Sequence, residues 1–295
     1  MNILITGGTG FIGKSLIPAL MVDETSHLTI LTRDKSTQDK ASIDWIEDLA
    51  ELDNGATFDV VINLAGAPID KRWSVSYKKT IIESRIGITK SLYQLIERLE
   101  TKPKHVISAS AIGFYGAQGH NTVTETSKPH PEFTHDLCRE WEEEAQKIET
   151  LGSFVSIMRL GVVLGRGGGI LKKLSPPFKL GLGGKIGSGQ QFLSWVHMDD
   201  VVAAILFMMQ QNKSSVYNLT APHPVTNLEW TKALADAVKR PAIFPMPACV
   251  VKTLFGEMGE RLLLNGQNVI PENLQKAGFT FQYPKIDMAL ADLIS

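Results

Sequence analysis

This chain of 295 residues has few cysteines, almost no net charge and no long apolar run. Its two cysteines, Cys138 and Cys249, are far apart and in no metal-ligand spacing, which excludes a disulfide framework and suits a reducing compartment. A formal net charge of −1 gives no electrostatic reason to expect nucleic acid or an anionic membrane as partner. The longest apolar run, residues 201–209, is too short to span a bilayer. The chain opens on residues typical of a buried strand rather than a secretory signal, so we expect a cytoplasmic protein with a small-molecule partner.

The first half of the chain alternates apolar, β-rich segments with helix-like stretches. Near-continuous apolar strands separated by helices favour a parallel sheet covered on both faces, which is the doubly wound Rossmann-type α/β fold. The third strand of that fold has a weak signal and is expected within residues 41–52. The other expected strands are residues 3–6, 28–31, 60–64, 106–108 and 154–160, with helices around 77–99 and 133–149.

After Leu160 the sequence becomes rich in glycine up to residue 190, which indicates either a flexible connection or a binding loop. A strand and helix are then expected over 192–211 and a strand over 216–219. Thr226 and Glu229 fit a capping box that opens a helix over 226–238. We therefore predict a dinucleotide-binding domain over 1–165, to which 191–220 returns. The remainder of 166–295 would form a smaller α+β region with the substrate loop and C-terminal helices.

A glycine motif follows the first strand directly and opens a helix. Gly7, Gly10 and Gly13 would let the backbone turn tightly, approach a pyrophosphate and pack the helix on the sheet. The helix N-terminus would then direct its amide donors at the phosphates. The predicted contacts with the cofactor at this turn are Gly7, Thr9, Gly10, Phe11, Ile12 and Gly13.

The second strand ends at Thr32 and Arg33, where the adenosine ribose of a bound dinucleotide should lie. An acid at this point would hold the 2′-hydroxyl of NAD, whereas the guanidinium of Arg33 suits a 2′-phosphate. Asp34 is adjacent and opposes this interpretation, and a merely solvated Arg33 is the alternative. We expect NADP(H) as the cofactor.

The fourth expected strand ends in small residues, Asn63, Leu64, Ala65 and Gly66. Small residues at the carboxyl end of a strand allow a flat cofactor to lie across the sheet edge. A tight turn from strand to loop would use the same residues, and both interpretations can hold together.

Taken together, these segments resemble the extended short-chain dehydrogenase/reductase superfamily, which includes nucleotide-sugar epimerases. More specifically, the chain resembles the atypical "epimerase family", some members of which are labelled cell-division inhibitor homologues. The resemblance covers nearly the whole chain and implies a Rossmann-type fold more firmly than a reaction. The motifs that carry it are residues 7–13, 63–68, 71–73, 108–110 with 115–116, 132–134 with 141–142, 181–189 and 195–200.

Active members of the superfamily carry Tyr-x-x-x-Lys on the helix after the serine strand, where the tyrosine moves a proton and the lysine lowers its pKa. The resemblance aligns Thr134 with that tyrosine and Cys138 with that lysine. No tyrosine occurs between residues 116 and 216. The usual proton relay is therefore missing.

Three residues are candidates to replace that relay. Ser110 matches the superfamily serine that binds a substrate oxygen, or it simply ends a strand. Tyr115 is a possible acid but more typical of packing, and His135 is a proton donor near neutrality or a solvated helix residue. Cys138 is expected as an apolar filler near the nicotinamide rather than a nucleophile.

Arg85 replaces an asparagine that many relatives carry, on a helix face directed at the cofactor. Its guanidinium would hold a cofactor phosphate or a substrate anion, with a surface salt bridge as the alternative. His197 belongs to a motif that we expect to be structural. The loop of residues 165–189, together with Lys185, Ser188 and Gln190, is the expected lid or substrate wall.

Two functions remain open on these grounds. The first is an NADP(H)-dependent oxidoreductase or epimerase-like enzyme with an altered proton relay, whose substrate is a small polar molecule, nucleotide-linked or not. The second is an NADP(H)-binding regulatory protein without turnover, linked to assembly or cell division. The missing relay favours the second, whereas the glycine-rich loop and Ser110 favour the first.

Overall fold

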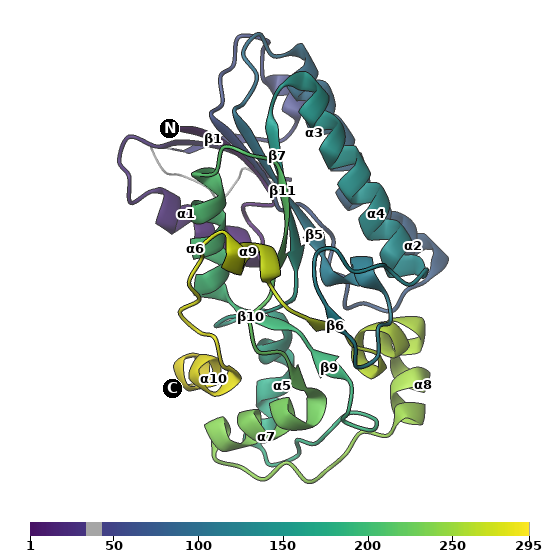
Figure 1. Ribbon diagram of the computed structural model, residues 1–295. Helices are drawn as coiled ribbons and strands as arrows, with labels where there is room; N and C mark the ends of the chain where they lie inside the picture. The colour runs from purple at the N-terminus through teal and green to yellow at the C-terminus, as the bar shows by residue number, and fades with distance from the viewer. Residues whose placement is uncertain (34–42, 295) are drawn as a thin grey trace.

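A computed structural model describes residues 1–33 and 43–294, and its centre is a seven-stranded, all-parallel sheet (Figure 1). The strand order is β11-β7-β5-β4-β1-β2-β3, so β2 and β3 follow on one side of β1, whereas β4 and the later strands are added on its other side. The predicted Rossmann-type fold is therefore confirmed. The strands are β1 (Asn2–Thr6), β2 (His27–Leu31), β3 (Ile43–Ile46), β4 (Val60–Asn63), β5 (His105–Ala111), β7 (Phe154–Leu160) and β11 (Ser215–Leu219).

The weak third strand lies inside the window predicted for it. β3 is only four residues long and pairs with β2 alone, so it forms one edge of the sheet. Asp44 is exposed and Trp45 half-buried, and this mixed pattern explains why the sequence signal was weak.

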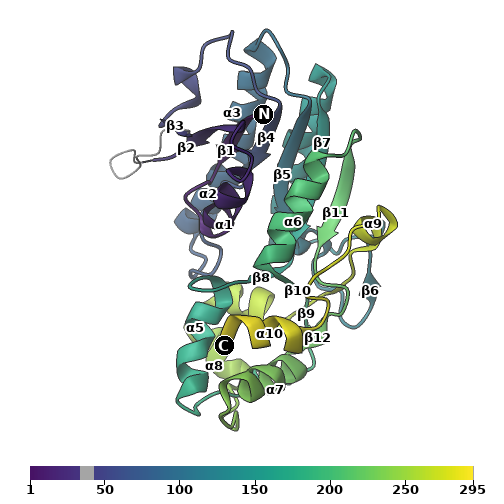
Figure 2. The same ribbon diagram turned by 90° about the vertical axis from the view of Figure 1, so that its left-hand side faces the viewer.

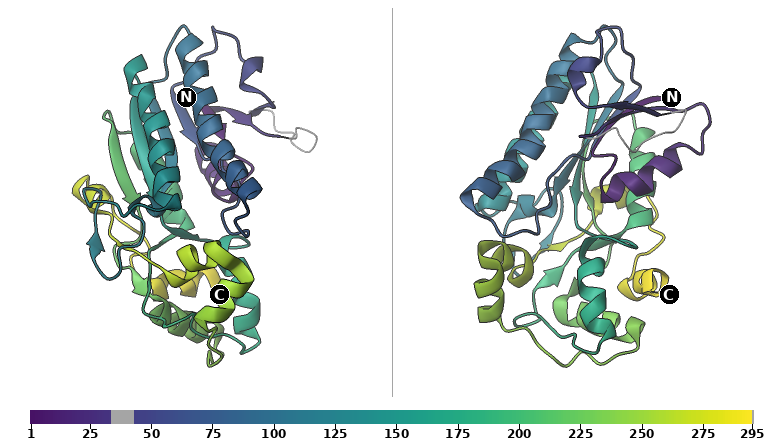
Figure 3. Two further views of the ribbon diagram at one scale, coloured as in Figure 1. Left: turned by 90° about the vertical axis from the view of Figure 1, so that its right-hand side faces the viewer. Right: turned by 180° about the vertical axis from the view of Figure 1, so that it is seen from behind.

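Helices cover both faces of the sheet (Figures 2 and 3). Ile3 and Ile5 pack in one core cluster with the helices α1 (Phe11–Leu20) and α6 (Met198–Met209). Leu4, between them in sequence, packs in a second cluster that includes Leu92 and Leu95 of α3 (Ile88–Arg98). Alternate residues of a strand point to opposite faces, so one short apolar strand supplies both cores.

The helix predicted over residues 77–99 is not continuous. It consists of α2 (Val75–Ile82), a π-helical turn η2 (Glu83–Gly87) and α3. A π-helical turn inserts an extra residue into a helix and is frequent at functional sites. Arg85 lies in this turn, and α4 (Phe133–Gln146) packs beside α3.

The rest of the chain forms a smaller lobe below the carboxyl ends of the strands (Figure 1). Thr226 and Glu229 make the predicted capping box at the start of α7. No helix within residues 1–33 and 43–294 is long and apolar enough to cross a membrane. The elements of the lobe and its connections are β6 (Thr122–Val123), β8 (Val162–Leu164), α5 (Gly169–Lys179), β9 (Phe192–Leu193), β10 (Trp195–His197), β12 (Val225–Thr226), α7 (Asn227–Val238), α8 (Ala248–Gly259), η5 (Glu260–Leu264), β13 (Asn268–Val269), α9 (Glu272–Lys276) and α10 (Ile286–Ile294).

Candidate functional site

The turn between β1 and α1 lies directly on the end of β4. Gly7 has φ +71°, and its backbone carbonyl accepts a hydrogen bond of 2.9 Å from the amide of Gly10. A Cβ on Gly7 would lie 2.6 Å from the backbone carbonyl carbon of Leu64. Both the backbone angle and this close approach require glycine.

Two further glycines close the turn against the sheet. A Cβ on Gly13 would lie 2.3 Å from the carbonyl oxygen of Gly8, so the first turn of α1 rests on the loop itself. A Cβ on Gly8 would lie 2.7 Å from Cγ2 of Ile30 in β2. Gly8 was not among the predicted site residues, because its close neighbour belongs to another strand.

Gly10 differs from these glycines because its Cβ position is almost open. The nearest atom to a Cβ there is the Gly7 carbonyl oxygen at 3.0 Å. Gly10 is also the N-cap of α1, and no side chain caps that helix. The backbone amides of Phe11, Ile12 and Gly13 thus begin a helix next to open space, which is the arrangement that binds phosphate.

Phe11 connects this turn to the glycine-rich segment after β8. Its ring occupies the space that side chains at three glycines would need. A Cβ would lie 2.9 Å from the nearest ring atom at Gly165, 2.4 Å at Gly168 and 3.0 Å at Gly169. The first part of the glycine-rich segment is therefore packed on Phe11, which accounts for its lack of side chains.

The predicted adenosine end lies at the end of β2. Thr32 is buried, and its amide donates to the carbonyl of Ile46 at 2.9 Å. Arg33 is exposed and forms no ion pair with another residue of the described chain. Asp34, which opposes the interpretation of Arg33, lies outside the described residues.

The side chain of Asn63 faces the interior instead of the sheet edge. Its amide oxygen accepts from Thr6 at 2.6 Å, and its amide nitrogen donates to Thr89 at 2.9 Å and to Ser108 at 3.3 Å. Asn63 thus joins β1, β4, β5 and α3 through buried hydrogen bonds. Of the four residues predicted at this strand end, Leu64, Ala65 and Gly66 are the ones with exposed surface.

Two of the three relay candidates are sealed in the core. Ser110 donates to the carboxylate of Glu142 at 2.6 Å. Tyr115 is fully buried, donates to Asn218 at 2.6 Å and accepts from Arg159 at 2.9 Å, and burial raises the pKa of its phenol to about 12. A phenol in this setting neither reaches a substrate nor releases a proton near neutrality.

The helix α4 brings Thr134 and Cys138 to the end of β5, as the resemblance implied. A Cβ on Gly113 would lie 3.1 Å from Cβ of Thr134 and 3.7 Å from Sγ of Cys138. The hydroxyl of Thr134 donates to Glu132 at 2.6 Å, and burial raises the pKa of the Cys138 thiol to about 12. Neither residue can replace the missing phenol and ammonium.

His135 is also buried, but one of its ring nitrogens has no hydrogen-bond partner within the described residues. Its Nδ1 lies 2.7 Å from the carbonyl oxygen of Phe114, so Nδ1 carries the proton in the neutral ring and donates it to that carbonyl. Nε2 then carries the lone pair, and it has no hydrogen-bond partner within the described chain.

Arg85 makes no salt bridge with any residue that the structure describes. Its guanidinium is half-buried and donates to the carbonyl oxygens of Ala67 at 3.0 Å and Ile81 at 3.2 Å. Its Cζ lies 5.4 Å from the ring centroid of Trp141 on α4. The surface alternative raised for Arg85 is therefore wrong, because its partners are backbone carbonyls and an aromatic ring.

Among the described residues, three ion pairs connect the Rossmann part to the C-terminal lobe. One joins the loop after β4 to α5, the second joins α2 to α8, and the third joins the start of α4 to η5. Sequence reasoning missed them because the partners lie more than about a hundred residues apart. The pairs are Asp70–Lys173 at 2.6 Å, Lys78–Glu257 at 2.7 Å and Glu132–Arg261 at 3.0 Å.

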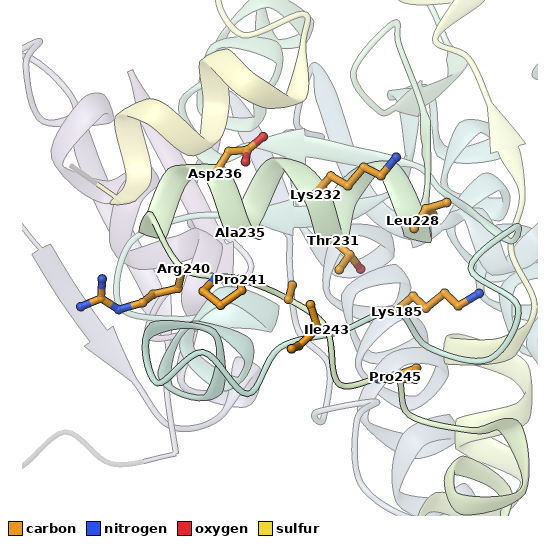
Figure 4. Close-up of a pocket in the computed structure, with 11 residues that line it drawn as sticks. Lys185, Leu228, Thr231, Lys232, Ala235, Asp236, Arg240, Pro241, Ile243 and Pro245 are labelled. Atoms are coloured by element: carbon orange, nitrogen blue, oxygen red, sulfur yellow. The ribbon is translucent and has the colours of Figure 1, made fainter.

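The second part of the glycine-rich segment is tied into the lobe. The amides of Phe244 and Met246 donate to the carbonyls of Gly183 and Lys185, each at 2.9 Å. Lys185 also lines a groove of about 510 Å³ between α7 and residues 240–245 (Figure 4). No residue of the predicted cofactor site lines this groove, so the expected lid residue Lys185 faces another surface.

Family models match both parts of the chain. The NAD dependent epimerase/dehydratase family matches residues 3–220, and a domain of unknown function, DUF1731, matches residues 246–293. An epimerase family protein of Staphylococcus aureus (strain N315) is 40% identical over 296 residues, which cover 99% of this chain and 98% of that protein. A relative with the same description from Staphylococcus saprophyticus is 38% identical over 301 residues, with the same coverage.

Solved structures agree with these matches. The human epimerase family protein SDR39U1 (isoform 2), determined with NADPH, is 30% identical with a TM-score of 0.90, covering 100% of this chain and 99% of that chain. A nucleoside-diphosphate sugar epimerase from Corynebacterium glutamicum is 29% identical with a TM-score of 0.79, covering 100% of this chain and 58% of that chain. MoeE5 in complex with UDP-glucuronic acid and NAD shares the fold at 21% identity, with a TM-score of 0.80 and coverage of 100% and 98%.

Proposed function

The chain belongs to the NAD dependent epimerase/dehydratase family, and we propose that it binds NADP(H) and acts as an oxidoreductase or epimerase-like enzyme on a small polar substrate. The observation that carries this proposal is the open space at Gly10, at the uncapped N-terminus of α1. A pyrophosphate fits that space, because uncapped backbone amides face it and no side chain fills it.

The residues that would hold the cofactor follow from the geometry. Phe11 and Ile12 would donate their backbone amides to the pyrophosphate. Arg33, exposed at the end of β2, would pair with a 2′-phosphate. The human relative determined with NADPH supports this choice, whereas the more distant MoeE5 was determined with NAD.

When bound, the nicotinamide would supply a hydride donor or acceptor. A proton must move at the same time, and Tyr115, Thr134 and Cys138 are unsuited to moving it. We assign that role to Nε2 of His135, whose tautomer is set by the Phe114 carbonyl. The substrate would lie between α4 and the C-terminal lobe, where the loop after β4 also ends.

A binding protein without turnover is the second candidate. The observation that favours it is the neutral Cys138, buried where active relatives of the superfamily carry a lysine. In that case the dinucleotide would act as a signal and the chain as a regulator. Binding of NADP(H) is common to both functions, and only turnover separates them.

Calorimetric titration of NADPH and NADH into the purified chain tests the binding. Absence of NADPH binding to folded protein would remove the proposed function. Small molecules that copurify with the native chain, identified by mass spectrometry, supply candidate substrates for a single-turnover assay at the nicotinamide absorbance band. His135→Gln should slow that turnover without weakening NADPH.

UDP-galactose is a discriminating test compound. We expect little or no epimerisation, because the phenol and ammonium of the usual relay are missing. Robust epimerisation that survives Thr134→Ala and Cys138→Ala would show that another relay operates in this chain and that the role given to His135 needs its own test with that substrate.

A further inference from the structure

The guanidinium of Arg85 is a partly buried charge without an acidic partner in the described chain. Its hydrogen bonds go to the carbonyls of Ala67 and Ile81 and, at 3.4 Å, to the hydroxyl of Ser84. Burial lowers the pKa of this guanidinium below its usual value. A cation removed from water is normally paired with an anion, so an unpaired one indicates a missing ligand.

Two hydrogens of the guanidinium are unused by the described residues, and one of its faces is left uncovered by a glycine. The Nη1 group donates to Ile81 and Ser84, and Nη2 uses one of its hydrogens on Ala67. The Nε hydrogen and the second Nη2 hydrogen have no acceptor among the described residues. A Cβ on Gly66 would lie 3.1 Å from Cζ, 3.2 Å from Nη2 and 3.5 Å from Nε of Arg85. These distances place the Cβ position over the flat face of the guanidinium, and Gly66 is exposed, so the glycine leaves that face uncovered.

The guanidinium lies beside α4, the helix that carries the proposed proton donor His135. Trp141 of α4 lies against the guanidinium, and Cys138 lies three residues earlier on the same helix. The helix α4 covers the opposite face of the sheet from α1, which carries the phosphate turn (Figure 1). A neutral residue at 138 also fits, because an ammonium there would repel Arg85.

From these contacts we propose that Arg85 and the space beside Gly66 form a binding site for an oxyanion of the substrate, either a carboxylate or a phosphate. Nε and Nη2 would hold two of its oxygens side-on, as a guanidinium holds planar or tetrahedral oxyanions. The inference rests on the proposed function in that the oxyanion would lie beside the bound nicotinamide. It narrows the substrate to an acid.

Calorimetric titrations with malonate and with inorganic phosphate, in the absence and presence of NADPH, test the site. We expect at least one of them to bind the wild-type chain, and the preferred anion distinguishes a carboxylate from a phosphate. Arg85→Met should lower the affinity for that anion by at least about tenfold, whereas the affinity for NADPH should change by less than about threefold. Lys90→Met removes an exposed charge from neighbouring α3 and is the matched control.

Gly66→Ala gives a second variant in case Arg85→Met does not fold. It keeps the guanidinium but places a methyl group 3.1 Å from Cζ, over the flat face, so it should displace the guanidinium and also weaken binding of the anion. Three results would overturn the site: neither anion binds the wild type, both variants bind it as the wild type does, or the loss in Arg85→Met falls on NADPH. If NADPH fails to bind while Arg85-dependent anion binding persists without it, the proposed function fails and the oxyanion site stands.

Discussion

The guanidinium of Arg159 and the carboxylate of Glu142 form a doubly hydrogen-bonded ion pair between β7 and α4. Nε–Oε1 measures 2.8 Å and Nη2–Oε2 measures 2.7 Å, and the two side chains are only 6% and 5% exposed. Ser110 donates a third hydrogen bond to the same carboxylate. This pair explains why Ser110 is unavailable to a substrate, and it concerns the stability of the fold more than its chemistry.

Glu142→Gln should lower the free energy of unfolding by about 3–5 kcal/mol, because it leaves the Arg159 charge buried and unpaired. Urea unfolding measures the change. Glu143→Gln, which breaks an exposed ion pair with Arg139 on the same helix, should change it by less than about 1 kcal/mol. Equal effects of the two substitutions would contradict the structural role given to Glu142.

Gly10→Val should abolish dinucleotide binding and leave the fold intact, because its Cβ enters open space next to the helix amides. Calorimetry and circular dichroism measure the two properties. Gly13→Ala is the opposite case, since its Cβ meets the Gly8 backbone and should cost stability first. Unchanged affinity in a folded Gly10→Val chain would exclude the site.

Arg33→Ala should weaken the binding of NADPH and leave the affinity for NADH nearly unchanged. The only chemical difference between the two cofactors is the 2′-phosphate, and a charge-assisted contact with it contributes about 1.5–3 kcal/mol, or one to two decades of affinity. The wild type should therefore prefer NADPH by at least about tenfold. Arg240→Ala removes another exposed arginine, outside the site, as a control. Equal losses for both cofactors would remove Arg33 from this role.

One thiol per native chain should react with a disulfide reagent at pH 8, and two after denaturation. Cys249 is exposed, whereas burial raises the pKa of Cys138 to about 12 and keeps it protonated. The Cys249→Ser variant should show no fast reaction when native. A fast reaction in that variant would mean that Cys138 is accessible and that its role needs revision.

His105 should make stability depend on pH between about 4 and 6.5. Burial lowers the pKa of His105 to about 4 in the folded chain, against about 6.5 when unfolded, so the unfolded state binds more protons in this window. Stability should fall as the pH falls through the window, by about 2–3 kcal/mol from this residue.

Unfolding of His105→Gln compared with the wild type across that pH range isolates this contribution. His120→Gln, at an exposed position, is the control and should keep the wild-type slope. A slope in His105→Gln equal to that of the wild type would assign the pH dependence to other groups.

The fold was predictable because its signals are local. The apolar run Ile3, Leu4 and Ile5 predicts a strand buried on both faces, and the glycines that follow it predict a phosphate-binding turn. The capping box of Thr226 was equally readable, since both partners lie within four residues. Such features depend on spacing along the chain, which the sequence contains directly.

The site was predictable only in part, because its contacts join distant residues. Asn63 matched a cofactor-lining motif, yet its amide bonds to residues up to 57 positions away in the interior. Tyr115 pairs with Asn218, 103 positions further on. Arg85 was singled out from the sequence, but the uncovered guanidinium face beside Gly66 depends on how two elements approach each other.

The packing of Phe11 against Gly165 and Gly168 means that two distant stretches of sequence can change only together. A chain that keeps the ring has no room for side chains at those glycines, whereas a chain with a smaller residue at position 11 is free to acquire them. Exchanging only one of the two stretches between homologues would leave either a clash or a void between the residue at position 11 and the segment after β8. Chimeras of this family should therefore exchange both together.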